Sequence, residues 1–420
     1  MTRWRFVHAA DLHLDSPFVG LADYHPELAQ ELVEATFASF RGLIDLCLQS
    51  EAAFLLLAGD LFDGPQRSLK AQLRLREQLA RLADAGIETF IVHGNHDYLG
   101  STGINLEWPN GVTVFPASGV EMAEVRRGGE TLARIYGLSH AGPSETANLT
   151  ERFPVAEHGP FSLGLLHANL DRNPEHENYA PCSLADLARV SYDYWALGHI
   201  HRPSVRRPSQ PAVVYAGNPQ GRHLKESGLR GCYVVEVDGH AVSPQFHPLG
   251  VIRWEGMAVD ISGREGMDQL LGQLANLLEE QRPAPPAHGV ILRLSLKGRG
   301  PVHRELKLPG TLEEVLEVLR EQGRGQSPWV WPEGLEAATG LDWDLPALRQ
   351  GSDLVATLLE QLHQARQAQE MPREMQELLA PLYQHPSGRR YLTPLLDLPW
   401  QDLLDRVTEE LLGRLRGGPE

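Results

Sequence analysis

Five apolar segments, each followed at once by a polar cluster, constrain the fold of this 420-residue chain more than any other feature. In order along the chain they are "WRFVHAADLH", "AAFLLLAGD", "ETFIVHGNHD", "FSLGLLHANL" and "YDYWALGHIH". Each has the length and composition of a buried β-strand. Segments with a helical period separate the first three, and this β-α-β-α-β order predicts parallel strands joined by right-handed crossovers and covered by helices.

The two helices between these strands are marked by residues that start or stop helices. The first is predicted over residues 26–49, with Pro26 in its first turn, and the second lies within residues 68–86 and ends at Gly86. Three later strand-like segments, "TLARIYGL", "AVVYAG" and "CYVVEVDG", have short connections. We therefore expect the second half of this domain to be more antiparallel.

Composition and periodicity change near residue 250, and a chain of this length usually contains more than one domain. We expect an α/β domain over residues 1–250, a small α+β cap over 251–345 and a helical region over 346–420. The last predicted helix, "WQDLLDRVTEELLGRL", carries an apolar stripe. The stripe consists of Leu403, Leu404, Val407, Leu411 and Leu415.

The composition, with 42% hydrophobic and 22% charged residues, indicates a globular protein. Apolar runs such as "FLLLA" are too short to cross a bilayer, and the first residues lack the apolar core of a signal peptide. The three cysteines, Cys47, Cys182 and Cys232, are widely spaced and form no C-x-x-C pattern. We expect them to be core residues of a cytoplasmic protein without a membrane segment.

The formal net charge of -17 argues against a protein that coats nucleic acid nonspecifically, because such binding depends on clustered Lys and Arg. One segment, between His199 and Gly231, has the opposite balance, with Glu226 as its single acid. Its basic residues are Arg202, Arg206, Arg207, Arg222, Lys225 and Arg230. The sequence thus allows a local basic groove within an acidic protein.

The polar clusters are predicted to converge, because ligands of open α/β sheets bind beyond the carboxyl ends of the strands. The candidate metal ligands in the clusters are Asp11, His13, Asp60, Asn95, His167, His199 and His201. A mixture of carboxylate, imidazole and amide suits Mn²⁺, Fe²⁺ or Zn²⁺, whereas Ca²⁺ prefers oxygen alone. Seven ligands overfill one site, so we expect two divalent ions about 3.5–4 Å apart that share a bridging carboxylate.

A metal pair of this kind suits the hydrolysis of a phosphoester. It lowers the pKa of a bound water and stabilises the charge that grows on the phosphoryl oxygens. Asn95 is a neutral ligand, which keeps the charge of the site compatible with an anionic phosphate. The cluster "GNHD" is more specific than a lone Asp-x-His or Gly-Asp, because average residue usage yields it by chance in roughly one chain in several hundred.

Taken in order, "DLH…GDLFD…GNHD…H…GHIH" resembles the calcineurin-like metallophosphoesterase superfamily. The resemblance implies a β-sandwich flanked by helices, with a dinuclear metal site at the edge of the sheets. The segments "FVHAADLHLDSPF", "LLAGDLFDG", "ALGHIHRP" and "YAGNPQGR" are similar to bacterial DNA repair exonucleases related to the SbcD nuclease subunit, in their YhaO branch. This similarity covers about residues 4–240, and the C-terminal part resembles the cap of that family only loosely.

The resemblance also implies a role for each residue that matches the motifs of the family. One metal would be held by Asp11, His13, Asp60 and His201, and the other by Asp60, Asn95, His167 and His199. Asp60 would bridge the two metals. His96 would be catalytic, facing the substrate to protonate the leaving oxygen or to stabilise the developing charge, and Asp63 would orient His96.

Several neighbours of these clusters have two interpretations. His8 is expected to be a packed strand residue and not a ligand. His93 and Asp97 are expected to support the loop around them, with contact to the substrate as the alternative for His93. The three basic residues nearest the predicted site could bind DNA phosphates beside the metals, or they could form a solvated basic loop. These residues are Arg202, Arg222 and Lys225.

By resemblance, the chain is expected to be a Mn²⁺-dependent 3′→5′ DNA exonuclease with single-strand endonuclease activity. Relatives of this kind work with a coiled-coil ATPase of the SMC-like class, so the stripe from Leu403 to Leu415 is either a docking surface or the core of a helix bundle. A homodimer is a further expectation. A phosphodiesterase for small molecules or cyclic nucleotides stays open, because a fold does not fix the substrate. A metal-free scaffold is disfavoured, because every expected ligand position is filled.

Overall fold

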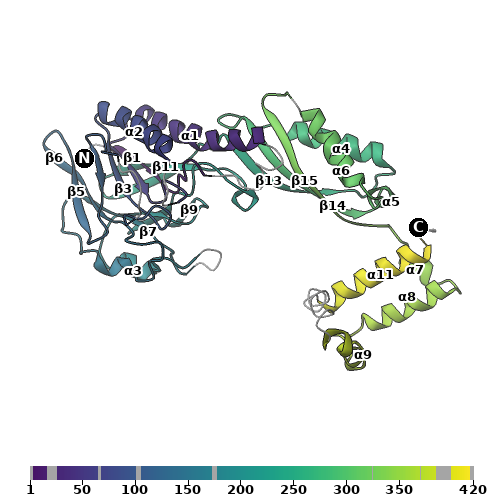
Figure 1. Cartoon of the computed structure of the whole chain (residues 1–420). Helices are drawn as coiled ribbons and strands as arrows, with labels where there is room; N and C mark the ends of the chain where they lie inside the picture. The colour runs from purple at the N-terminus through teal and green to yellow at the C-terminus, as the bar shows by residue number, and fades with distance from the viewer. Residues whose placement is uncertain are drawn as a thin grey trace. The chain divides into compact units, whose positions relative to one another are not determined.

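The computed structural model describes residues 3–16, 26–64, 68–100, 106–172, 177–323, 325–368, 370–384 and 399–416 (Figure 1). The chain forms two compact units. The first contains residues 1–256, 278–293 and 323–333, and the second contains residues 257–277, 294–322 and 334–420. Both units are therefore assembled from segments that are distant in sequence.

The first unit contains a six-stranded sheet in the order β12-β11-β1-β2-β3-β4. The strands are β1 (Trp4–Ala9), β2 (Phe54–Ala58), β3 (Glu88–Val92), β4 (Val112–Val114), β11 (Gly231–Asp238) and β12 (Ala241–Pro248). β1 to β4 are parallel, and β11 is antiparallel to both β1 and β12. Helices α1 (Pro26–Gln49) and α2 (Leu69–Asp84) connect the first three strands, which confirms the predicted order.

A second six-stranded sheet in the first unit has the order β5-β6-β7-β8-β10-β9. Its strands are β5 (Glu121–Arg127), β6 (Glu130–Leu138), β7 (Phe161–His167), β8 (Tyr194–Gly198), β9 (Ser204–Arg207) and β10 (Ala212–Tyr215). The four central strands are parallel, and only the edge strands β5 and β9 are antiparallel to their neighbours. The expectation of a more antiparallel second half was therefore wrong for this sheet. Long connections, one containing α3 (Leu184–Ala188), return the chain across the sheet and allow parallel pairing.

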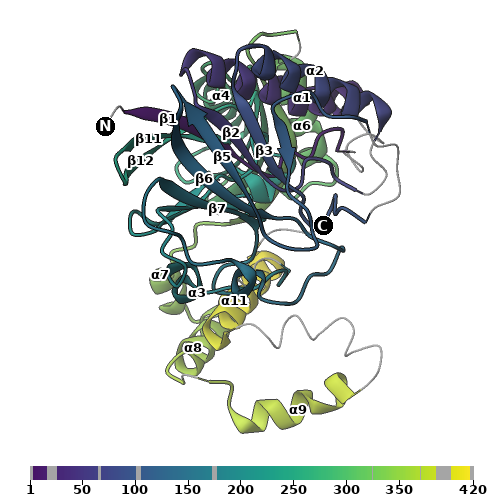
Figure 2. The same ribbon diagram turned by 90° about the vertical axis from the view of Figure 1, so that its left-hand side faces the viewer.

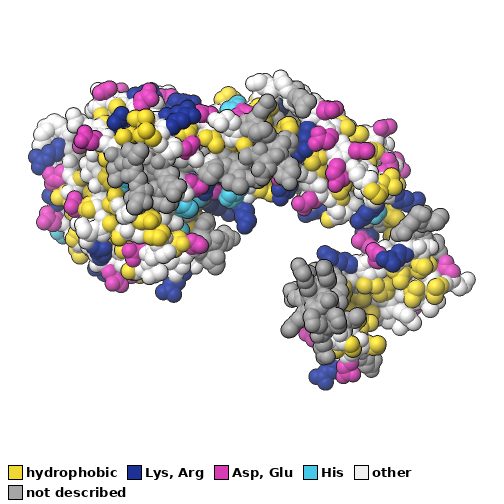
Figure 3. Space-filling model, in the orientation of Figure 1, with side chains coloured by type: hydrophobic (Ala, Val, Ile, Leu, Met, Phe, Trp, Pro, Cys, Tyr) yellow, Lys and Arg dark blue, Asp and Glu magenta, His cyan; other side chains and the backbone are white. Residues whose placement is uncertain are grey.

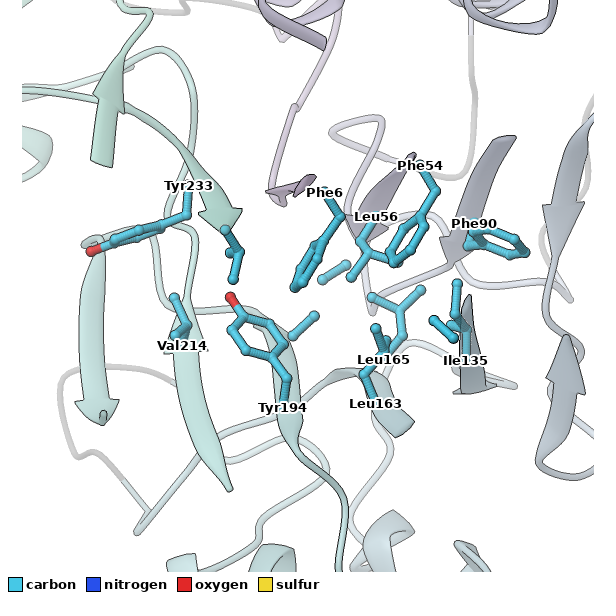
Figure 4. Close-up of a cluster of buried hydrophobic side chains, with 14 of the residues drawn as sticks. Phe6, Phe54, Leu56, Phe90, Ile135, Leu163, Leu165, Tyr194, Val214 and Tyr233 are labelled. Atoms are coloured by element: carbon cyan, nitrogen blue, oxygen red, sulfur yellow. The ribbon is translucent and has the colours of Figure 1, made fainter. Parts of the chain in front are cut away.

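Side chains from both sheets form the core between them (Figure 4). Phe6, Phe54 and Phe90 come from the first sheet, and Leu163 and Tyr194 come from the second. The ring of Phe6 stacks on that of Phe54 at a centroid distance of 5.1 Å and meets the ring of Tyr194 edge-on at 5.1 Å. Each such aromatic pair contributes about 0.5–1.5 kcal/mol beyond the burial of its surface. This packing fixes the ends of the strands in the two sheets relative to each other.

Helices α1 and α2 cover the outer face of the first sheet (Figure 2). Successive strand residues point to opposite faces, so Leu55 and Leu57 contact the helices while their neighbours in sequence contact the second sheet. A sheet covered on both faces explains why these segments are apolar at every position. The side chain of Ser68 caps the start of α2, and Gly86 follows its end with a φ of 72°, as the sequence predicts.

Three strands form a separate sheet, and the division between the two units falls within them. They are β13 (Ile252–Asp260), β14 (Gly289–Arg299) and β15 (Trp329–Gly340). The helices in this part are α4 (Met267–Glu280), α5 (His303–Leu306) and α6 (Thr311–Gly323). Leu270 and Leu274 of α4 are buried, as are Val315 and Leu319 of α6. This part thus has the mixed helix and strand content that the sequence predicts.

The described C-terminal helices are α7 (Leu345–Arg349), α8 (Leu354–Ala365), α9 (Arg373–Gln384) and α11 (Trp400–Arg416). α11 packs against α8 through a cluster that includes Leu359 and Leu412. The predicted stripe coincides only in part with the buried face of α11. Leu404 is buried, but Val407 and Leu415 are 41% and 47% exposed, because the buried face runs through Leu404 and Leu412.

Two expectations about composition can be compared with the described residues. Cys47, Cys182 and Cys232 are buried and unbonded to one another, as predicted for core residues. Among the described helices, none is both long enough and apolar enough to cross a membrane.

Candidate metal centre

The polar clusters that follow five strands lie together at one edge of the two sheets of the first unit. Asp11 and His13 follow β1, Asp60 follows β2, Asn95 follows β3, His167 ends β7, and His199 and His201 follow β8. The backbone N–H of His199 donates a hydrogen bond to Asp11 Oδ1 at 3.0 Å, which joins the end of β8 to the end of β1. The ring Nδ1 of His167 lies 3.0 Å from the carbonyl oxygen of Ala58 and likewise joins β7 to β2.

The backbone at these strand ends adopts an unusual conformation. The φ angles of Asp11, His13, Asp60 and His199 are 52°, 42°, 49° and 96°, all in the left-handed region. A residue other than glycine pays about 1–3 kcal/mol for such a conformation, which persists where surrounding contacts enforce it. The turns that result point these side chains toward one another and away from the strands.

Close approach of the chain explains two glycines of the motifs. A Cβ atom on Gly94 would lie 2.2 Å from Asp60 Oδ1, and one on Gly198 would lie 1.8 Å from the carbonyl oxygen of Ala58. Both distances are far below any allowed contact. Any residue larger than glycine at these two positions would therefore displace the side chains of the centre or separate its two sheets.

One group of ligand-type atoms, which we call the first half-site, comes from Asp11, His13 and His201. These atoms all lie within 4.8 Å of one another, which is close enough for one cation to contact them all. The Nε2 atoms of His13 and His201 are 3.2 Å apart. Asp11 and His13 are fully buried, so the half-site is largely shielded from water.

The second half-site comprises Asn95, His167 and His199. His167 Nε2 lies 3.0 Å from Asn95 Oδ1, and the ring of His199 is 5.2 Å from the ring of His167. Asp60 Oδ2 lies 3.3 Å from His167 Nε2 and 3.9 Å from His13 Nε2. This one carboxylate is thus within reach of both half-sites, which is the position that a bridging ligand requires.

The outer ring nitrogens of the histidines have partners that fix their orientation. The Nδ1 atoms of His13 and His201 lie 2.9 Å from Asp63 Oδ1 and 2.6 Å from Glu226 Oε1, and His167 Nδ1 contacts the Ala58 carbonyl. The hydrogen bonds at Nδ1 of His201 and His167 direct the Nε2 lone pairs of these rings inward, as is typical of metal-binding histidines. His199 is reversed, because its Nε2 lies 2.8 Å from the carbonyl oxygen of Glu177, so it would bind through Nδ1. The donor set and its outer contacts therefore fit two divalent cations.

The pKa values of His167 and Asp60 also indicate a site that suits cations. Burial alone would lower the pKa of His167, but the charge of Asp60 and its hydrogen bond outweigh burial and raise that pKa to about 9. The pKa of the Asp60 carboxyl is held well below its usual range, since His167 and other nearby histidines outweigh the opposite effect of its burial. Without a metal, a proton on His167 compensates the negative charge of these carboxylates. A divalent cation would supply the same compensation and displace that proton.

His96 contacts Asp63 through the main chain of Asp63 and not through its carboxylate. The side chain of His96 is 41% exposed, and its ring lies 5.1 Å from the ring of His13. Its Nδ1 contacts the backbone carbonyl of Asp63 at 3.1 Å, whereas the nearest Asp63 carboxylate oxygen is 4.0 Å away. That carboxylate instead contacts His13, Ser16 and Arg222. Asp63 thus contacts His96 through its main chain and His13 through its side chain.

The group of His13, Asp63 and His96 is also compact enough to suggest a cation. Arg222 makes this unfavourable, because its guanidinium lies 2.6 Å from Asp63 Oδ1 and already supplies a positive charge there. The side chain of Arg222 is 14% exposed, so it is not presented to solvent like Arg202 and Lys225. The three basic candidates therefore fall into two classes, one paired within the protein and two exposed.

The neighbouring residues lie where the sequence predicts supporting roles. Asp97 is buried and accepts hydrogen bonds from the N–H groups of Gly94 and Leu61 at 3.0 Å each. His93 Nδ1 lies 3.0 Å from Asp97 Oδ2. His8 is buried in β1 and contacts the hydroxyl of Tyr194 at 3.0 Å, as expected for a packed residue.

Glu226 and His140 are residues of the centre that the sequence did not reveal as such. Glu226 is buried and contacts His201, and its one signal in the sequence is that it is the single acid of a basic segment. His140 Nε2 lies 2.7 Å from the carbonyl oxygen of His167 and is also buried. No motif in the sequence marks His140.

Two family models match the chain. Residues 5–203 match the calcineurin-like phosphoesterase family, and residues 254–340 match the middle domain of the metallophosphoesterase YhaO. Members of the first family normally bind two divalent metals, in agreement with the donor set described above.

Relatives of known name support the same assignment. The uncharacterized metallophosphoesterase YhaO of Bacillus subtilis is 36% identical over 391 residues, which cover 93% of each chain. The DNA double-strand break repair protein Mre11 of Aeropyrum pernix is 26% identical over 230 residues, 51% of this chain and 53% of that protein. Mre11 of Sulfurisphaera tokodaii is 26% identical over 244 residues, 55% of this chain and 57% of that protein. The chain therefore belongs to the calcineurin-like metallophosphoesterases and, within them, to the YhaO family.

Proposed function

We propose that this metallophosphoesterase is a DNA nuclease, a 3′→5′ exonuclease with single-strand endonuclease activity that acts in DNA repair. The observation that carries the proposal is the position of Asp60, whose Oδ2 is within 4 Å of a histidine nitrogen in each half-site. A shared carboxylate suits a two-metal centre for phosphodiester cleavage. The relatives named DNA double-strand break repair protein Mre11 support DNA as the substrate.

The metal ligands are proposed to be Asp11, His13, Asp60, Asn95, His167, His199 and His201. When bound, two divalent cations supply a hydroxide near neutral pH and stabilise charge on the phosphoryl oxygens. The imidazole and carboxylate donors favour Mn²⁺, with Fe²⁺ and Zn²⁺ as chemical alternatives. Asp11 and Asp60 are buried, so the carboxylates that would hold the cations are shielded from bulk water.

His96 is proposed to serve as the general acid. It is the exposed histidine beside the buried ring of His13, so a substrate phosphate at the centre can reach it. The carbonyl of Asp63 accepts the Nδ1–H of His96, which orients the ring and leaves Nε2 to donate a proton to the leaving oxygen. The carboxylate of the same Asp63 contacts the proposed ligand His13. Asp63 therefore connects His96 to the metal centre.

Arg202 and Lys225 are proposed to contact DNA phosphates, because both are exposed and lie within one or two residues of His201 and Glu226. Phosphate contacts of this kind position the substrate without reading its sequence. Arg222 is paired with carboxylates and is left out of this role. Its pairing, together with the net charge of -17, favours a second candidate function, a phosphodiesterase for small molecules or cyclic nucleotides.

A coiled-coil ATPase of the SMC-like class is proposed as the partner, with α11 as the docking helix. On the face drawn in Figure 3, hydrophobic side chains gather over the C-terminal helices. Val407 and Leu415 of the predicted stripe are exposed, and so is Leu354 at the start of α8. A homodimer through the same face is the alternative assembly.

The decisive experiment incubates purified protein with end-labelled duplex DNA, single-stranded DNA and a bis-aryl phosphate, each with Mn²⁺, Mg²⁺ or EDTA. Shortening of labelled DNA from its 3′ end with Mn²⁺, and none with EDTA, is the expected result. Cleavage of the small ester without cleavage of DNA would favour the second candidate function and refute the nuclease.

The role of His96 is tested in the same assay. His96→Ala should lower the rate by roughly 100- to 10,000-fold, the usual contribution of a general acid. His158→Ala is the matched control, because His158 is exposed and lies before the start of β7, at the opposite end of that strand from His167. If His96→Ala cleaves DNA as fast as His158→Ala, His96 is not the acid.

A further inference from the structure

The guanidinium of Arg222 lies between two carboxylates. Its Nη1 is 2.6 Å from Asp63 Oδ1, and its Nη2 is 3.5 Å from Glu226 Oε1. Each carboxylate in turn contacts one histidine of the first half-site: Asp63 lies 2.9 Å from His13 Nδ1, and Glu226 lies 2.6 Å from His201 Nδ1. One cationic side chain therefore connects the outer contacts of both histidines.

Further hydrogen bonds make this arrangement rigid. The hydroxyl of Ser16 donates to Asp63 Oδ2 at 2.9 Å. The second oxygen of Glu226 accepts the backbone N–H of Arg222 at 2.7 Å and the side-chain amide of Asn218 at 2.8 Å. Arg230 donates to the backbone carbonyl of Glu226 at 3.0 Å. Both carboxylates thus have partners on each oxygen, and neither is available to rotate freely.

The second half-site is built in a different way. The outer nitrogens of His167 and His199 contact backbone carbonyl oxygens, those of Ala58 at 3.0 Å and Glu177 at 2.8 Å. A backbone carbonyl is held by the fold itself, whereas a carboxylate on a side chain must be held by other side chains. The first half-site therefore depends on Arg222 in a way that the second does not.

We propose that Arg222 is a positioning residue of the first half-site, which fixes the carboxylates that aim His13 and His201 at the metal and does not bind substrate. This inference rests on the metal centre of the proposed function, but not on its substrate. A phosphate contact by Arg222 would require its guanidinium to leave a carboxylate 2.6 Å away, although its side chain is only 14% exposed.

Mn²⁺ binding to the metal-free protein tests the proposal without any substrate. Calorimetric titration counts the equivalents and gives their affinities, and electron paramagnetic resonance distinguishes a spin-coupled Mn²⁺ pair from a single ion. In Arg222→Gln, one of two equivalents should bind roughly 10–100-fold more weakly, the usual effect of removing an outer partner of a ligand. The other equivalent should keep its affinity, and the signal of a single ion should appear at low Mn²⁺. Arg206→Gln, an exposed arginine on β9, is the matched control and should bind as the parent does.

Two further variants keep the test decisive. Arg222→Lys retains the positive charge, but its single ammonium group reaches one carboxylate at most. Glu226→Gln keeps the shape of the side chain but loses its charge. Both variants should lower the affinity of the same single Mn²⁺ equivalent. Unchanged affinity for both equivalents in Arg222→Gln, combined with a raised KM for DNA, would overturn the proposal. Loss of folding by all three variants, judged by circular dichroism beside a folded Arg206→Gln, would overturn it too, since Arg222 would then support the fold as a whole. Absence of DNA cleavage by the parent protein would refute the nuclease and leave this result intact.

Discussion

Asp60 Oδ2 lies 3.3 Å from Nε2 of His167, and both side chains are shielded from solvent. Opposite charges this close and this buried interact strongly, so the proton on His167 is part of what stabilises the metal-free protein. The same two atoms are proposed to bind a metal. Proton and metal therefore compete for one position, and this competition has measurable consequences.

In EDTA, the protein should lose stability as the pH rises from 6.5 to 9. The folded state raises the pKa of His167 from 6.5 to about 9, so the stabilisation is complete below pH 6.5 and disappears as the pH passes 9. The free energy of unfolding should fall by about 3 kcal/mol over this range. Urea unfolding at several pH values measures the fall, and saturating Mn²⁺ should remove it because the cation replaces the proton. A flat profile in EDTA would contradict the charge assignment.

At acid pH, buried neutral histidines should destabilise the protein. Burial lowers the pKa of His8 to about 3 and that of His140 to about 4, while the unfolded chain takes up these protons near 6.5. Stability should therefore decline as the pH falls from 6.5 toward 4, by about 3 kcal/mol for His140. His140→Gln keeps a donor for the carbonyl of His167 and should make this decline shallower. The exposed-site variant His158→Ala should follow the parent curve, and equal slopes in all three proteins would count against the prediction.

Gly94→Ala should damage the centre. The new Cβ would lie 2.2 Å from Asp60 Oδ1, so either the loop or the shared carboxylate must move. We expect a loss of about 1–3 kcal/mol in stability, as is usual for an overpacked site, together with weaker Mn²⁺ binding. Gly119→Ala is the matched control, because a Cβ there meets no atom within 4 Å. Thermal unfolding and Mn²⁺ titration of both variants decide the matter, and indistinguishable variants would show that the loop has room.

The two faces of α11 should respond differently to substitution. Leu412 is fully buried against α8, so Leu412→Ala should cost about 2–5 kcal/mol. Val407 is 41% exposed, and Val407→Glu should change stability by less than about 0.5 kcal/mol. Chemical denaturation of the full chain compares the two. A large loss in Val407→Glu would mean that this face is covered within the protein and is not a docking surface.

Much of the fold could be predicted because it depends on local periodicity. The alternation of apolar runs and helical segments gave β1, α1, β2, α2 and β3 in the right order, and Gly86 gave the end of α2. The second sheet was harder, because parallel pairing of β6, β7, β8 and β10 depends on where long connections cross, which no local pattern records. Which residues of α11 are buried could not be predicted for a similar reason, since only the packing against α8 selects the buried face.

The candidate site was predictable in its inner part and not in its outer part. The side chains at the strand ends were found because each follows a strand directly and carries a donor that metals prefer. The sequence left Arg222 between a phosphate contact and a solvated loop and gave Glu226 no role, because the bonds between residues 218–230 and the centre form only when that segment folds back over His201. The sequence likewise could not show that Asp63 contacts His96 through its main chain, while its carboxylate contacts both His13 and Arg222.

The left-handed backbone of Asp11, His13, Asp60 and His199 bears on attempts to transplant this centre. A designer who copies the seven side chains onto the regular strand ends of another sandwich would place them with φ near -120°, where their Cβ vectors diverge. The sharp turns would have to be grafted together with the side chains. Gly94 and Gly198 would have to be grafted too, because they allow the close approach of the chain at this centre. In this protein the metal site depends on main-chain torsion angles as much as on donor atoms.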